Sequence, residues 1–494
     1  MDSPYTALEA RFQRLADIEG AIAVLSWDQA VCMPKGGGRV RADQLATLRR
    51  LAHDRLSSPD TAALLEEALG QDGLDAWQRA NLREMRRRHI RATALDPAIV
   101  EALARATSSC ELVWREARDQ SDFAMLRPHL EEVVRLTREA AAQGGAGLGL
   151  APYDALLDEF QPGLRAAEVE RLLVPVADAL PAMIEAAMAR QRPVMLPTGP
   201  FPIARQRELG RRLVERLGFD FHHGRLDEST HPFCGGVPDD IRITTRYRED
   251  EVVSALMAIL HETGHALYEA GLPRAWRGQP VGEARGIVIH ESQSLLIEMQ
   301  ACRSAEFVGF LAGELTRSFG PDPAFAPDNL QALYRRVERS LIRVDADELT
   351  YPLHIVLRWR LERALLAGDL AVADLPAAWN EAMHELLGIV PPDDRSGCLQ
   401  DIHWPVGGFG YFPDYTLGAM LAAQLFQAAL RELAELRASI AAGDMAPLLG
   451  WLRRAVHAHG ARLDWQELVV AATGAPLAPE PFLAHLRERY LGAG

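Results

Sequence analysis

Two histidines four residues apart, with a glutamate beside the first, carry the clearest chemistry in the sequence. The stretch from His261 to His265 reads His-Glu-Thr-Gly-His. Residues four apart in a helix lie on one face, so both imidazoles can bind one zinc ion while Glu262 takes a proton from water. Apolar residues flank the motif and predict a helix, and Gly271 and Pro273 predict where that helix ends.

Gly264 is an unusual residue for the middle of this predicted helix. A glycine there costs about 1 kcal/mol relative to alanine, because the backbone loses more conformational freedom. We therefore expect another segment of the protein to approach the helix backbone closely at this position.

A catalytic zinc usually takes three protein ligands and keeps a fourth position for water. Residues 287–296 follow a connection rich in glycine and proline, and they can form a second helix that folds back on the first. Glu291 in this segment is the candidate third ligand. Glu298, two turns further on the same face, and the neighbouring His290 are the alternatives. Adjacent residues on a helix point about 100° apart, so we do not expect Glu291 and His290 both to bind.

The composition allows a large buried core and argues against a nucleic-acid or membrane protein. The chain has 494 residues, of which 48% are hydrophobic, and a net charge of −15. An acidic balance disfavours nucleic acid and anionic membrane surfaces. No run of 18 apolar residues is present, which predicts no membrane span. Five scattered cysteines and an N-terminus without an apolar leader predict a cytoplasmic protein with reduced thiols.

Helical periodicity runs through most of the chain, with apolar residues recurring at spacings of three and four. Only residues 241–247 alternate like a strand, which predicts a small sheet beside the zinc helix. We expect one mainly α-helical catalytic domain over residues 1–494, with two lobes around a cleft and a boundary that the sequence does not reveal. The segments expected to be helical include 41–56, 61–70, 77–108, 111–142, 205–217, 329–366, 416–442 and 445–459.

A long segment rich in glycine and aromatic residues, 389–415, interrupts the helical pattern. A loop of this length inside a compact protein is more often functional than idle. It contains His403 and Tyr411, whose side chains can donate hydrogen bonds to the oxyanion that forms during peptide hydrolysis. The alternative is a surface loop in which these residues only pack.

Several separated motifs resemble those of the thermostable (Taq-type) metallocarboxypeptidase family. They include a Trp-Asp-Gln signature near the N-terminus, a mid-chain Tyr-Asp-Ala-Leu-Leu-Asp stretch, His-Pro-Phe, D-x-R-x-T, the zinc motif, His-Glu-Ser-Gln, I-R-x-x-A-D and G-x-x-Q-D-x-H-W. The sequence departs from the family pattern at Pro352, where asparagine is expected, and at Leu295 and Leu296. In order, the motifs lie at residues 27–38, 153–158, 231–233, 240–244, 261–265, 290–293, 342–347 and 397–404.

The resemblance implies an almost all-α, two-lobed peptidase fold with a deep groove, shared with neurolysin-like oligopeptidases, and a homodimer. It also implies that Glu291 is the third zinc ligand. The D-x-R-x-T and G-x-x-Q-D-x-H-W motifs are expected to line the closed end of the groove. A closed end makes an exopeptidase, because a peptide can enter only by its terminus.

The function that follows is a zinc metallocarboxypeptidase that releases C-terminal amino acids from peptides, with Glu262 as general base and cobalt as a possible substitute metal. An arginine suits the terminal carboxylate of the substrate, and Arg343 and Arg242 are the candidates. As alternatives, Arg343 pairs with Asp347 within a helix, and Arg242 is a charge at a strand edge. His231 either contacts the substrate or packs in the core.

Two other functions remain open at this stage. The first is an endo-acting oligopeptidase or a dipeptidyl carboxypeptidase of the same fold, which the size of the released product would distinguish. The second is a catalytically inactive helical interaction protein, which the intact zinc motif disfavours.

Overall fold

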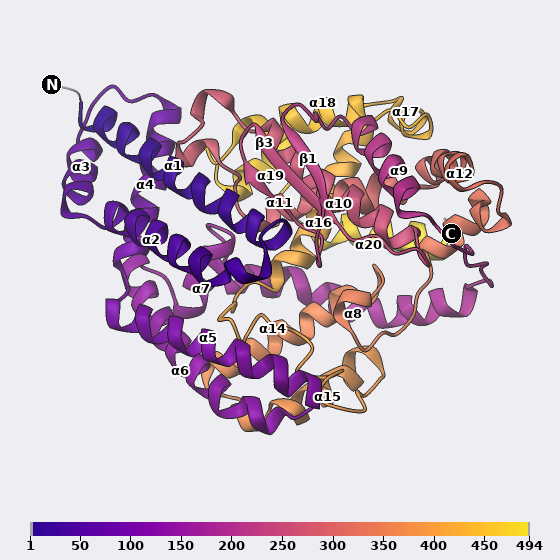
Figure 1. Cartoon of the computed structure of the whole chain (residues 1–494), viewed down its shortest axis with the longest axis horizontal. Helices are drawn as coiled ribbons and strands as arrows, with labels where there is room; N and C mark the ends of the chain where they lie inside the picture. Colours follow the sequence, from indigo (N-terminus) through magenta and orange to yellow (C-terminus); the bar gives the residue numbers. More distant parts are fainter. Residues whose placement is uncertain (1–2, 493–494) are drawn as a thin grey trace. The chain divides into compact units, whose positions relative to one another are not determined.

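Helices carry most of the chain, as the sequence periodicity predicts (Figure 1). The computed structural model describes residues 3–492. The chain forms two compact units, and each is assembled from three separate segments. Unit 1 comprises Met1–Ala92, Pro193–Tyr334 and Leu421–Leu477, and unit 2 comprises Thr93–Arg192, Arg335–Met420 and Ala478–Gly494. Because neither unit is continuous in sequence, no linker marks the division.

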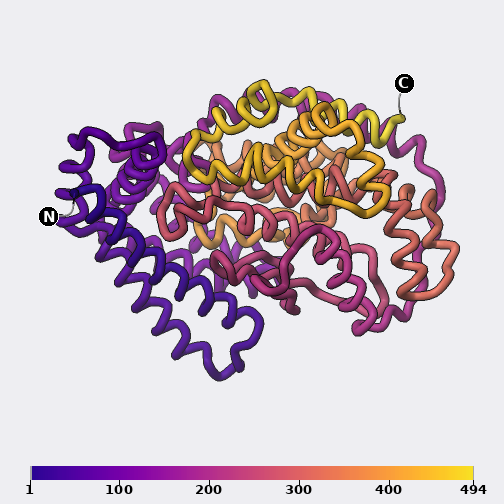
Figure 2. The backbone as a smooth tube through the Cα atoms, turned by 90° about the horizontal axis from the view of Figure 1, so that it is seen from above, coloured from indigo at the N-terminus to yellow at the C-terminus, as the bar shows by residue number. Residues whose placement is uncertain are grey.

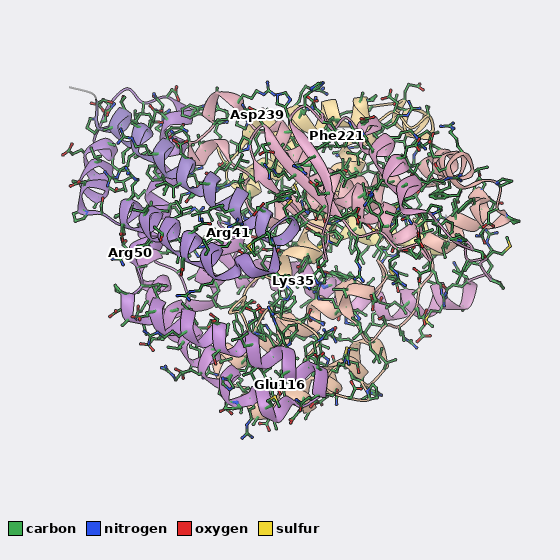
Figure 3. The ribbon with its side chains drawn as sticks, viewed as in Figure 1. Lys35, Arg41, Arg50, Glu116, Phe221 and Asp239 are labelled. Atoms are coloured by element: carbon green, nitrogen blue, oxygen red, sulfur yellow. The ribbon has the colours of Figure 1, made fainter. Side chains whose placement is uncertain are left out.

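Unit 1 begins with a hairpin of two long helices whose connecting turn carries Lys35 (Figures 2 and 3). Ser3 caps the first helix by accepting a hydrogen bond from the Thr6 backbone, and proline follows at the first helical position. The helices of unit 1 are α1 (Pro4–Val31), α2 (Gly38–Leu56), α3 (Pro59–Leu69), α4 (Ala76–Thr93), α9 (Ile203–Arg216), α10 (Val253–Gly271), α11 (Ile287–Leu295), α12 (Ala305–Phe319), α13 (Pro327–Tyr334), α17 (Leu436–Ala441), α18 (Ala446–Ala455) and α19 (Trp465–Thr473).

A three-stranded sheet in unit 1 packs against α10 (Figure 1). Its strands are β1 (Gly224–Glu228), β2 (Cys234–Val237) and β3 (Asp240–Thr245), in the order β1-β3-β2. β1 runs parallel to β3, and β2 runs antiparallel to it. The predicted strand is confirmed as β3, although it ends two residues earlier than 247. The sequence did not reveal β1 and β2, because they are short, contain glycine and lack an alternating pattern.

The described part of unit 2 contains helices joined by loops and no strand, and α16 (Pro413–Glu432) has residues in both units. Among the described helices, only α8 is long and apolar enough to cross a membrane, and 44% of its most apolar window is buried. Within unit 2, α8 packs against α14 and α20, as a core helix does. The helices of unit 2 are α5 (Pro97–Gln120), α6 (Phe123–Leu148), α7 (Pro152–Phe160), α8 (Ala166–Arg190), α14 (Tyr351–Ala367), α15 (Leu375–Leu387) and α20 (Pro479–Leu491).

Four long predicted helices are wrong in their continuity. One of them, 416–442, is interrupted at residues 433–435, between α16 and α17. The segments 77–108 and 111–142 contain breaks before Pro97 and at Ser121, where Asp96 and Asp122 cap new helices and Ser121 is left-handed with φ 55°. The segment 329–366 is helical only up to Tyr334 and again from Tyr351. Between them, the Asp347 carboxylate accepts backbone hydrogen bonds from three residues, which replaces helical pairing.

Candidate metal centre and active site

Helix α10 presents the zinc motif from the core of unit 1. Leu256, Ile259 and Leu260 are at most 1% exposed and fix the helix against its neighbours. A Cβ atom added at Gly264 would lie 2.5 Å from the Ser294 Cα atom of α11. The expectation of a close backbone approach at this glycine is therefore confirmed, and it is α11 that approaches.

Helix α11 brings Glu291 to the two histidines of α10. The Glu291 carboxylate lies 3.5 Å from His265 Nε2 and 4.0 Å from His261 Nε2. One ligand atom from each of the three residues can be chosen so that all lie within 4.8 Å of one another. Ligands of a tetrahedral zinc ion with bonds of about 2.0–2.2 Å lie roughly 3.4 Å apart. The donor set and spacing therefore fit one divalent ion after a small contraction.

The outer nitrogen of His261 is held by a carboxylate. Glu298 accepts a hydrogen bond from His261 Nδ1 at 2.9 Å, and its other oxygen pairs with Arg303 at 2.6 Å. The π-helical turn Leu296–Cys302 carries Glu298. Glu298, which the sequence offered as an alternative third ligand, therefore accepts a hydrogen bond from His261 Nδ1. The other ring nitrogen, Nε2, faces Glu291. Such a contact at Nδ1 fixes the tautomer and orientation of a ligand histidine.

The outer nitrogen of His265 meets another histidine. His265 Nδ1 lies 2.6 Å from His290 Nδ1, and His290 Nε2 lies 2.8 Å from the Glu269 carboxylate. Both ring nitrogens of His290 are thus engaged with outer partners, so its geometry does not favour it as the third ligand. Burial lowers the pKa of His265 well below 6.5, which keeps the ring neutral as ligation requires.

Negative charge surrounds the cluster. Burial alone would lower the pKa of His261, but Glu298, Glu291 and Glu262 outweigh it and raise this pKa to about 10. Such a field is what a divalent cation needs. Glu262 follows His261 on the buried part of α10 and is 7% exposed. Burial is the largest cause that raises its pKa, to about 7, a value suited to a general base.

Arg242 and His231 lie on the sheet and its approach, and the structure does not gather them with the three metal-ligand candidates. The Arg242 guanidinium pairs with Asp240 at 2.5 Å and lies 4.5 Å from the ring centroid of Trp27. It is a neutralised and stacked group at 15% side-chain exposure. His231 is exposed, and its backbone carbonyl accepts a hydrogen bond from the Ser229 hydroxyl. A core-packing role for His231 is wrong, because its side chain is on the surface.

Arg343 lies in unit 2, in the single 3₁₀ turn Arg343–Asp345 and not in an α-helix. Its Nε and Nη2 atoms donate to Asp401 at 3.0 and 2.9 Å, and Nη1 donates to the Tyr351 hydroxyl at 2.8 Å. The alternative of an α-helical pair with Asp347 is wrong, because the 3₁₀ turn ends at Asp345 and Arg343 pairs with Asp401 instead. Arg358, which is fully buried, also pairs with Asp401, at 2.6 Å.

The Asp401 carboxylate therefore pairs with two guanidinium groups, those of Arg343 and Arg358. Burial lowers the pKa of Arg358 to about 10, so this side chain still carries its charge at neutral pH. Burial alone would raise the pKa of Asp401, but Arg358 and Arg343 hold it well below its usual range. The cluster keeps a surplus positive charge, which an anionic group can neutralise.

His403 and Tyr411 lie together in unit 2, with ring centroids 5.7 Å apart. Tyr411 also packs edge-on against Phe160 at 4.9 Å. Burial lowers the pKa of His403 to about 4, so its ring is neutral at physiological pH. Both groups are held by an aromatic cluster that includes Phe412 and Tyr415. A neutral imidazole and a phenol can each donate one hydrogen bond.

Several residues of these networks did not stand out from the sequence. Glu269 continues the spacing of four that begins at His261 and His265, and this repetition was a usable signal. Arg358 gave no signal, because a single arginine within an apolar helix pattern reads as a surface charge. Asp401 lies inside a recognised motif, but its two arginine partners come from distant segments.

Comparison with known proteins places the chain in a family. It matches the model of the carboxypeptidase Taq (M32) metallopeptidases over residues 7–490. It is 39% identical to Thermostable carboxypeptidase 1 of Thermus thermophilus over 504 residues, which covers 98% of each chain. The solved structure of Metallocarboxypeptidase 1 of Trypanosoma cruzi is 41% identical, with a TM-score of 0.97 over 99% of each chain. The M32 carboxypeptidase of Deinococcus radiodurans is 36% identical, with a TM-score of 0.94 over 99% of each chain.

These likenesses define a peptide hydrolase that uses a divalent metal ion. The chain belongs to the M32, or Taq-type, family of metallocarboxypeptidases. The predicted family, the mainly helical fold and the carboxypeptidase activity are thereby confirmed.

Proposed function

We propose that this carboxypeptidase uses one zinc ion per chain, held by His261, His265 and Glu291, to release single amino acids from the C-termini of peptides. The observation that carries the proposal is the convergence of these three side chains beside a buried Glu262. A set of two histidines and one glutamate is typical of zinc peptidases, and it leaves one position open. Cobalt, which accepts the same donors, is a possible substitute.

When bound, the zinc ion supplies a Lewis acid and makes water acidic enough to react near neutral pH. Glu262 takes a proton from the attacking water and later delivers it to the leaving amine, which is general acid–base catalysis. Tyr411 and His403 are the candidates for donating hydrogen bonds to the developing oxyanion. Removing one such donor typically lowers the rate by about 10²–10³-fold.

The charge of the arginine clusters supports Arg343 over Arg242 as the anchor for the substrate carboxylate. Arg242 already has its own acidic partner in Asp240. Arg343 shares Asp401 with Arg358, so a second carboxylate would complete the charge balance. Arginine's planar fork suits such an anion. His231, exposed at the approach to β2, is proposed as a peripheral substrate contact.

The decisive experiment compares one peptide with a free C-terminus, with an amidated C-terminus and with a blocked N-terminus. Products are followed by mass spectrometry, alongside metal analysis of the purified protein. We expect single residues to leave the free and N-blocked peptides one after another, and the amidated peptide to be spared. Release of residues in pairs would indicate a dipeptidyl carboxypeptidase. Equal cleavage of the amidated peptide would indicate an endo-acting oligopeptidase.

The remaining proposals concern the surroundings of the enzyme. All five cysteines of the sequence are free in the structure, which supports a reducing, cytoplasmic location. The net charge of −15 supports peptides, and not nucleic acids or anionic membranes, as binding partners. A homodimer follows from the family resemblance. Sedimentation analysis tests the dimer, and fractionation of cells tests the location.

A further inference from the structure

The two histidines of the metal cluster differ in the residue that contacts their Nδ1 atom, the ring nitrogen away from Glu291. His261 has the Glu298 carboxylate, which is itself paired with Arg303. His265 Nδ1 has the ring of His290 as its partner, and the Glu269 carboxylate lies on the far side of that ring. These contacts form a relay of three residues, from His265 on α10 through His290 on α11 to Glu269. Glu269 lies on α10 again, one helical turn beyond His265.

The hydrogen bonds in this relay can be ordered in only one way when His265 binds a metal. His265 Nε2 faces Glu291, so its lone pair must point to the ion and its Nδ1 must carry the proton. His290 Nδ1 must then accept that proton's hydrogen bond. A neutral His290 consequently carries its own proton on Nε2, which donates to Glu269. Metal binding and the tautomers of both rings are linked.

The ring of His290 is held in place for this task. It packs edge-on against Tyr268 with ring centroids 5.3 Å apart. Tyr268 is fully buried, and its hydroxyl accepts a hydrogen bond from the Arg285 backbone at 3.1 Å. His290 also directly precedes Glu291 on α11. One helix therefore supplies a metal ligand and, at the adjacent residue, the group that orients a ligand of the other helix.

We propose that His290 and Glu269 are positioning residues that act in series to hold His265 in its metal-binding orientation. The inference rests on the proposed metal ligands. It goes beyond them in assigning a function to His290, the histidine that opens the His-Glu-Ser-Gln motif, and to Glu269. Partners behind metal-bound histidines typically change metal affinity by about 10–100-fold when they are removed.

A packing role for His290 is the competing explanation, and the chain offers a matched control. His457 packs on the same Tyr268 ring, with centroids 5.2 Å apart, and is 1% exposed. Its Nε2 bonds to the Gln293 side chain and not to a metal ligand. His457→Ala therefore removes a comparable ring from Tyr268 and leaves the relay intact. Loss of packing alone would affect both variants alike.

The test measures zinc dissociation constants by competition with a chelator at fixed pH, with thermal unfolding as a check on folding. We expect about 10–100-fold weaker binding in His290→Ala and nearly wild-type binding in His457→Ala. His290→Phe, which keeps a ring beside Tyr268 but offers His265 no acceptor, serves as the second variant if His290→Ala does not fold, and the same loss of zinc affinity is expected of it. Wild-type zinc affinity in folded His290→Ala, or an equal loss in His457→Ala, overturns the proposal.

A double-mutant cycle tests whether the two residues act in series. Glu269→Ala alone should weaken zinc binding, and it should add little to His290→Ala, because Glu269 reaches the metal only through that ring. Full additivity would show that Glu269 acts independently of His290 and would overturn the serial arrangement. Failure of the proposed ligand set is recognised separately, because His265→Ala would then retain zinc.

Discussion

Glu362 of α14 should make unit 2 less stable as the pH rises through neutrality. The residue is fully buried, and its carboxylate accepts hydrogen bonds from the Tyr153 hydroxyl at 2.5 Å, Trp404 Nε1 at 3.1 Å and the Gly410 backbone at 3.0 Å. No ion pair to Glu362 is found among residues 3–492. Its three donors favour the charged form, whereas burial opposes it. Burial is the larger effect and raises the pKa to about 7.

The magnitude follows from that pKa. A rise from 4.5 to about 7 corresponds to roughly 3 kcal/mol, since each pKa unit is worth about 1.36 kcal/mol. A carboxyl group with a raised pKa binds its proton more tightly in the folded protein than in the unfolded chain. The wild type therefore loses stability as the pH rises from about 4.5 to about 7, and the loss is complete above that range. Glu362→Gln, which stays neutral and keeps the shape, escapes this loss.

The assay compares the free energy of unfolding of wild type and Glu362→Gln in denaturant at pH 5 and pH 8. We expect near-equal stability at pH 5 and a variant more stable by about 2–3 kcal/mol at pH 8. Glu348→Gln is the matched control, because Glu348 is also buried in unit 2 but pairs with Arg489 at 2.9 Å. Its replacement removes the negative charge that pairs with the buried Arg489 and should destabilise the protein at both pH values. A Glu362→Gln variant that becomes relatively less stable at pH 8 would refute the reasoning.

Three further predictions concern the active site. Glu262→Gln should keep its metal and fold but lose several orders of magnitude in kcat, because proton transfer is removed while coordination stays; near-normal turnover would assign the base elsewhere. Gly264→Ala should destabilise the protein by about 1–3 kcal/mol and weaken zinc binding, since the new Cβ lies 2.5 Å from α11 backbone; an unchanged melting temperature would contradict the observed approach. Arg343→Ala should remove the preference for free over amidated C-termini, while Arg242→Ala should preserve it; the reverse result in paired kinetic assays would make Arg242 the anchor.

The sequence alone determined the chemistry that is local to one helix. His261, Glu262 and His265 are linked by a spacing that has meaning only in a helix, and the flanking apolar residues predict that helix. Gly264 predicted the close approach of another segment, because glycine destabilises a helix and nothing in the neighbouring sequence explains its presence there. The mainly helical fold was readable for the same reason, since periodicity of three and four is a property of neighbouring residues.

Only the tertiary structure decided the contacts between distant segments. The outer partners of the histidines come from another helix, and a π-helical turn that no periodicity reveals carries Glu298. Arg343 lies in a short 3₁₀ turn and not in an α-helix, because buried side-chain contacts, not intrinsic propensity, order the chain around it. Its pairing with Asp401 and the competition from Arg358 depend on segments more than 40 residues apart. Long-range charge sharing of this kind leaves no periodic trace in a sequence, because it arises only when folding brings those segments into contact.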